Sequence, residues 1–206
     1  MVLSKLNLND AFTNVAIDDA GISEDFMDLA TNLVVSRRNG ILSGSVALVS
    51  VDQDDTQADV AVGLVKALAS INQSVALVNA NLRSSWTPQI PNFTSLNLQS
   101  VLDSGQVDDD TTNVIVSPAD SVPNPIATLE SDGFSALIRS MEAGRNFVVV
   151  STPALMPLGD AKAVLGTVKN AILIIHRRQT RARNLKNGLT VLNALHTNVI
   201  GYVTVE

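Results

Sequence analysis

Short apolar runs alternate with segments of helical periodicity along most of this chain. Six runs are rich in Val, Leu, Ile and Ala and predict buried strands: 45–51, 74–78, 114–116, 147–150, 171–175 and 199–205. Apolar residues at three- and four-residue spacing predict five helices: 23–38, 58–70, 134–143, 161–168 and 185–195. This alternation predicts an α/β fold with a mostly parallel central sheet and helices on both faces, a three-layer sandwich.

Three segments depart from the alternation. Residues 1–22 are polar and mixed, and we expect an N-terminal arm before a single domain over 23–206. Residues 84–113 are rich in Pro, Asn and Ser and predict a long loop, and Pro123-Asn-Pro125 predicts a rigid turn. Ser23 is the predicted N-cap of the first helix, whose buried face carries Phe26, Leu29, Ala30 and Leu33.

Composition narrows the classes of function. The net charge of −6 makes the chain a poor match for nucleic acid or an anionic membrane surface. The absence of cysteine and the presence of only two histidines exclude disulfides, thiol chemistry and a Cys- or His-based metal site. No apolar run approaches the length of a membrane span, and the start of the chain lacks a signal-peptide pattern. We therefore expect a cytoplasmic protein.

The loop after the first predicted strand lies where open α/β sheets bind ligands, and here it is acidic. Residues 51–59 contain no Gly, Lys or Ser and four carboxylates: Asp52, Asp54, Asp55 and Asp59. A phosphate-binding loop needs glycines, a lysine and a magnesium-binding hydroxyl. One pair of like charges 4 Å apart costs on the order of 4 kcal/mol at an effective dielectric near 20, so this loop disfavours nucleotide phosphates. The aspartates either cap and solubilise the following helix or form a cation site.

Several stretches, in order, give the chain a resemblance to a known family. They are Glu24–Leu33, Ala61–Ala69, Val75–Arg83, Pro123–Pro125 with Leu129 and Phe134, and Phe147–Ala154 with Leu158–Ala161. Together they resemble the cytoplasmic domain of bacterial tyrosine kinases of capsule and exopolysaccharide synthesis. This family belongs to the deviant P-loop ATPases, which include septum-positioning and plasmid-partition ATPases. The resemblance spans about residues 24–205 and implies a P-loop NTPase-like fold.

The nucleotide-binding positions of that family are replaced here. In the first motif, Asp54 and Thr56 stand where the family has glycines, Gln57 replaces the lysine, and Ala58 replaces the residue with the magnesium-binding hydroxyl. In the second motif, Asn79 and Asn81 replace two aspartates. In the third motif, Ser151 replaces another aspartate. Asn keeps the size of Asp but loses the charge that holds magnesium or accepts a proton. The resemblance therefore implies a catalytically inactive homologue with no intact nucleotide site, no metal and no cofactor. We interpret Pro153 and Asp160, which match the family, as residues that shape the backbone outside the site.

Features that the family uses for assembly are reduced. Glu24 begins its E-x-x-R-x-x-R self-association motif, but Met27 and Ala30 stand where the arginines belong. The chain can still form an oligomer, but the motif that supports ring assembly in the family is not intact here. The family's C-terminal tyrosine cluster is reduced to Tyr202, which we expect to pack within the last strand.

Two further features are candidate partner contacts. Arg177, Arg178 and Arg181 belong to a basic cluster over 176–186, which is either a solvated helix start or a docking surface for an acidic segment. That segment belongs either to a partner or to the acidic loop 52–59 of the same or a neighbouring chain. Trp86 is either a partner anchor or a cover for the sheet edge. Together with Glu24 of the first helix, these residues make up the predicted partner-binding set.

The resulting hypothesis is a binding or regulatory module in polysaccharide synthesis or export, and not an enzyme. The resemblance implies a membrane chain-length regulator or an active kinase paralogue as partner, which would hold the domain at the inner face of the membrane. One alternative is a pseudo-ATPase for spatial organisation, of the septum- or pilus-positioning kind. The other is an enzyme with a re-purposed pocket, in which a divalent cation lies near Ser151 and Thr152 and is held by Asp52, Asp54, Asp55 and Asp160.

Overall fold

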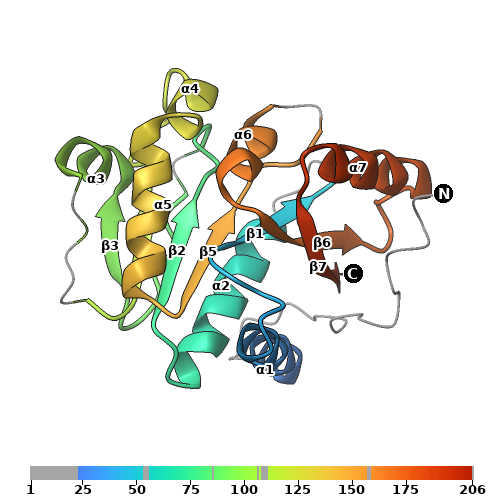
Figure 1. The fold of residues 1–206 in the computed structure, drawn as a ribbon, viewed down its shortest axis with the longest axis horizontal. Coiled ribbons are helices and arrows are strands. Elements are labelled where there is room, and N and C mark those ends of the chain that lie inside the picture. Colours follow the sequence, from blue (N-terminus) through green and yellow to red (C-terminus); the bar gives the residue numbers. More distant parts are fainter. Residues whose placement is uncertain are drawn as a thin grey trace.

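The computed structural model describes residues 23–52, 56–84, 86–105, 107, 111–156 and 159–205. Seven parallel strands form one sheet in the order β3-β4-β2-β5-β1-β6-β7 (Figure 1). The strands are β1 (Val46–Ser50), β2 (Val75–Asn79), β3 (Thr94–Asn97), β4 (Val114–Ser117), β5 (Phe147–Ser151), β6 (Asn170–His176) and β7 (Asn198–Val205). The helices are α1 (Glu24–Arg38), α2 (Thr56–Ser70), α3 (Leu98–Ser104), α4 (Pro125–Leu129), α5 (Asp132–Gly144), α6 (Asp160–Thr167) and α7 (Ala182–Ala194).

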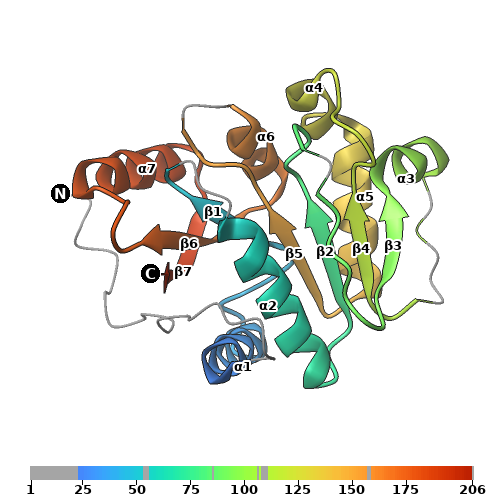
Figure 2. The same cartoon turned by 180° about the vertical axis from the view of Figure 1, so that it is seen from behind.

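The helices form two layers, one on each face of the sheet. α1 and α2 cover one face, where Leu33 and Leu64 are fully buried (Figure 2). α3 to α7 cover the other, where Phe134 and Met141 of α5 are fully buried (Figure 1). The central strands are buried on both sides, which explains their unbroken apolar runs. The predicted three-layer α/β fold is confirmed, and the sheet is parallel throughout.

The segment 84–113 is more regular than its composition predicts. β3 and α3 occupy positions 94–104, where we expected a loop. β3 is a short edge strand whose side chains are exposed or half-buried. The strand conformation of β3 therefore depends on its pairing with β4, in which Thr94 lies opposite Val114. A strand of this kind has no local apolar pattern from which it could be predicted.

The Pro-Asn-Pro segment starts a helix where we expected only a turn. Asn124 is the N-cap of α4, because its Oδ1 accepts the N–H of Ala127 at 3.4 Å. Pro125 occupies the first helical position, where a missing N–H costs nothing. None of the described helices is long and apolar enough to cross a membrane.

α1 begins as the sequence predicts. The Oγ of Ser23 accepts the N–H of Phe26 at 3.4 Å, and the predicted apolar face is buried. This face packs against α2, where Gly63 lies beneath the ring of Phe26. A Cβ at Gly63 would overlap the ring, so the glycine is what allows the close approach of the two helices.

Gly63→Ala is expected to lower the free energy of unfolding by about 2 kcal/mol, because the added methyl overpacks this contact. Urea unfolding followed by circular dichroism measures the change. Gly166→Ala in α6 is the matched control, since nothing lies within 4 Å of its added Cβ. We expect the control to be neutral or more stable by up to about 1 kcal/mol. Equal stability of the two variants would show that the α1–α2 contact tolerates the methyl.

Candidate functional site

Three central strands bring the candidate site together. β2, β5 and β1 are neighbours, and because they are parallel their carboxyl ends open at the same edge of the sheet. Asn79 at the end of β2 lies opposite Ser151 at the end of β5. Backbone bonds join the loops that follow: the N–H of Ala80 donates to the Ser151 carbonyl at 2.8 Å, and that of Leu155 to the Ser50 carbonyl at 2.9 Å. Two of the positions at which we predict that nucleotide-binding residues are replaced are thus side by side.

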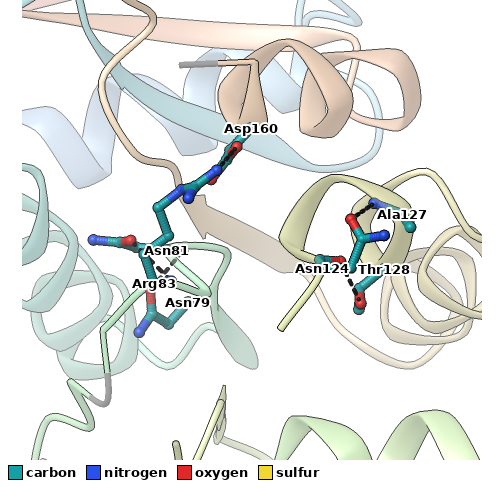
Figure 3. Close-up of polar contacts among 7 residues, drawn as sticks. All are labelled: Asn79, Asn81, Arg83, Asn124, Ala127, Thr128 and Asp160. Carbon is teal, nitrogen blue, oxygen red and sulfur yellow. Dashed lines mark hydrogen bonds and ion pairs between the residues drawn. The ribbon is translucent and has the colours of Figure 1, made fainter. Parts of the chain in front are cut away.

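The two amides after β2 organise their own loop. Asn79 is buried, and its Nδ2 donates to the backbone carbonyl of Trp86 at 2.8 Å. Its Oδ1 accepts the N–H of Asn81 at 2.9 Å. The Oδ1 of Asn81 in turn accepts the N–H of Arg83 at 3.4 Å (Figure 3). A carboxylate at position 79 has no donor for the Trp86 carbonyl, so the amide is the group this geometry requires.

A bidentate ion pair lies at the same edge. Asp160, fully buried at the start of α6, accepts from Arg83 Nε at 2.6 Å and from Arg83 Nη2 at 3.0 Å (Figure 3). The hydrogen bond to Asp160, together with the negative charge of that carboxylate, raises the pKa of Arg83. Asp160, which we interpret as a backbone-shaping residue, has a structural contact, and its partner Arg83 lies in the loop after β2. Asp160 is a buried charge that binds this loop, and the 77 residues between the partners hide this from local patterns.

The loop after β1 is attached to α7. The Oδ1 of Asp52 accepts from the Nδ2 of Asn184 at 2.7 Å. The other carboxylate oxygen, Oδ2, is buried and has no hydrogen-bond partner among the described residues. The first acidic residue of the loop therefore contacts the side-chain amide of a residue in the first turn of α7.

The other positions of this predicted set differ in their surroundings. Gln57, which we predict to stand in place of the family's lysine, is buried near the start of α2, and Ala58 beside it is half-buried. Thr152, after Ser151, is also buried, and its hydroxyl donates to the Leu48 carbonyl at 2.9 Å. Two positions lie outside what the structure describes: Asp54 and the side chain of Thr56.

The cation-site alternative loses one of its ligands. Both oxygens of Asp160 are occupied by Arg83, which already neutralises the carboxylate. Asp54 and Asp55 lie outside the described residues, so Asp52 is the one other proposed ligand whose position the structure describes. Within the described ranges, no group of three or more metal-ligating side chains is close enough to hold an ion.

The predicted partner contacts are placed on different parts of the surface. Glu24 is exposed in the first turn of α1, but Ala30 is completely buried against the α2 side of the core. The second arginine position of the self-association motif therefore faces inward. Trp86 is half-buried and packs on the same core, which favours its role as a cover. Tyr202 packs against the opposite core, as predicted.

The basic residues of the predicted set are at the surface. Arg177, Arg178 and Arg181 lie between β6 and α7, and all three are exposed. Sequence reasoning missed Arg83 and Asn184 as site residues. The Arg83 position carried a weak signal, because it ends the stretch that resembles the family's second motif. Asn184 carried none, since its partner lies 132 residues away.

No protein-family model matches the chain, and a search of curated proteins finds no match to it. Solved structures match it by fold. The chimerical protein CapA2B2 has a TM-score of 0.74 and 19% identity, over 91% of this chain and 85% of that chain. The kinase domain of the Escherichia coli tyrosine kinase ETK has a TM-score of 0.71 and 18% identity, over 86% and 74%. The MinD cell division protein of Aquifex aeolicus has a TM-score of 0.54 and 14% identity, over 79% and 69%.

These likenesses define the fold class: a P-loop NTPase-like three-layer α/β domain. Within that class, kinase domains match with TM-scores of 0.66 to 0.74, and MinD proteins with 0.54. At identities below 20%, the likeness establishes the fold of this chain, while function depends on the residues that occupy the site.

Proposed function

We propose that this domain is a catalytically inactive homologue of the capsule and exopolysaccharide tyrosine kinases and acts as a binding or regulatory module. Support comes from the motifs that resemble the family, and from the greater fold similarity to kinase domains than to MinD proteins. The spatial-organisation alternative is less well supported for the same reason. The partner we expect is a membrane chain-length regulator or an active kinase paralogue.

One observation carries the proposal. At the end of β2, where the family has an aspartate, Asn79 uses both ends of its amide to hold the following loop. The nearby carboxylate, Asp160, is neutralised by Arg83. Phosphoryl transfer is catalysed mainly by positioning and by charge at magnesium and phosphate, and these side chains are committed to structural contacts instead.

Purified full-length chain, incubated with millimolar ATP and magnesium, is expected to release no ADP above the protein-free rate. An active tyrosine kinase of the same class is the positive control. Thermal unfolding with and without Mg-ATP tests binding separately, because a ligand at 100 times its Kd stabilises by about 2.7 kcal/mol and shifts Tm by several degrees. We expect no shift. ADP release that requires magnesium and is lost in Gln57→Ala would overturn the proposal.

A further inference from the structure

Positive and negative residues are segregated along this chain. Residues 161–205 contain seven of its fourteen Lys and Arg and none of its twenty Asp and Glu. Five of these cations fall within ten residues, all exposed, on the turn from β6 to α7 and the first turns of α7: Arg177, Arg178, Arg181, Arg183 and Lys186. We call this group the cationic turn; it lies at the end of α7 that follows β6 (Figure 1).

The positive charges of the cationic turn lie at the N-terminus of α7, where they destabilise the helix. A helix N-terminus is a partial positive charge, so cations there are unfavourable and carboxylates favourable. α1 follows this rule, with acidic residues in its first turn and arginines in its last. α7 reverses it: Arg181 is the N-cap residue without a side-chain cap, Arg183 follows, and the first turn holds no acidic residue. A costly arrangement of this kind is expected where the charge serves binding.

The described carboxylates leave four of these five cations without an ion pair. Within the described ranges, no carboxylate lies within ion-pair distance of Arg178, Arg181, Arg183 or Lys186. Asp52 reaches α7, but it accepts from the Asn184 amide and not from a guanidinium. Arg178, Arg181, Arg183 and Lys186 therefore present donors to the solvent that form no ion pair with the described residues and can bind an external anion.

We propose that the cationic turn docks an acidic, extended peptide segment of a partner protein, a role that does not depend on whether the domain is catalytically inactive. Arginine guanidinium groups bind carboxylates bidentately, and Arg178, Arg181 and Arg183 present three exposed guanidinium groups. The size of the patch favours a short segment over a long polyanion. The rest of the chain carries a charge of −11, which would repel a duplex or an anionic bilayer that extended beyond the patch.

The test uses the full chain and a short fluorescent peptide in which glutamate alternates with serine. The same peptide with glutamine in place of glutamate is the neutral probe. Fluorescence anisotropy is expected to show binding of the acidic peptide alone, with an affinity that falls as salt rises. The triple variant Arg178→Ser/Arg181→Ser/Arg183→Ser is expected to bind about tenfold more weakly, since each exposed pair contributes a fraction of a kcal/mol to about 1 kcal/mol.

A control of equal net charge separates the patch from general electrostatics. Arg38→Ser/Arg139→Ser/Lys162→Ser removes three exposed cations from α1, α5 and α6, and it is expected to bind like the unaltered chain. Equal losses in both triple variants would overturn the proposal. So would tighter binding of duplex DNA or phosphatidylserine vesicles than of the peptide, lost in the same patch variant. If the patch triple does not fold, Arg178→Ser, which lies outside α7, supplies the comparison.

Discussion

Arg83→Ala is expected to lower the Tm of the domain by roughly 5 °C. Asp160 is fully buried, and the Arg83 guanidinium donates to both of its oxygens. Without Arg83 the carboxylate stays buried and loses its counter-charge, which costs more than the pair itself contributes. The Arg83 side chain is 45% exposed, so solvent screening keeps the effect below that of an enclosed pair. Thermal unfolding followed by circular dichroism gives the measurement.

The double variant Arg83→Ala/Asp160→Asn isolates the cause of that loss. Its buried amide carries no charge, so we expect it to recover much of the Tm lost in the single variant. Arg139→Ala, an exposed arginine of α5, is the control for removing a cation and should leave Tm unchanged. A double variant that is less stable than Arg83→Ala would mean that the side-chain contacts matter more than the unpaired charge.

The fold was predictable where a residue's environment is set by its near neighbours in the chain. β1 and β2 are covered by helices on both faces, and their runs of Val, Ala and Leu predict such buried strands. β3 has no such run. Its strand conformation depends on pairing with β4, which follows α3 and a further segment in the chain. α4 was missed because one proline on each side of Asn124 reads equally as a turn or as a helix start.

The candidate site divides in the same way. Asn79 and Ser151 end apolar runs, so their positions at the sheet edge follow from strand order once the strands are known to be parallel. The bonds that decide what the site can do are distant in sequence. Asp160 contacts Arg83, and Asp52 contacts Asn184, only in the folded chain. Residues this far apart in the sequence give no local pattern from which the contacts could be predicted.

Asn79→Asp is expected to destabilise the domain by about 3 kcal/mol at pH 8. The introduced carboxylate would be buried and would face the Trp86 carbonyl, to which the amide now donates at 2.8 Å. Two acceptors would then oppose each other in place of a hydrogen bond. Urea unfolding at pH 8 measures the loss. Asn81→Asp is the matched control, since the Asn81 side chain accepts from the Arg83 N–H and a carboxylate can do the same; it should cost under 1 kcal/mol.

The pH dependence of Asn79→Asp separates charge from shape. Burial and the facing carbonyl both disfavour the ionised form, so the pKa of the introduced carboxyl is raised in the folded state above its usual value of about 3.9. Below that value both states are protonated, and the acid can donate to Trp86 much as the amide does. The destabilisation therefore grows as pH rises from about 4 and becomes constant above the folded-state pKa. A loss that is the same at pH 4 and pH 8 would contradict this account. A variant that is as stable as the unaltered chain at both values would mean that the loop accepts the family's aspartate, and that the geometry of the loop does not require the amide.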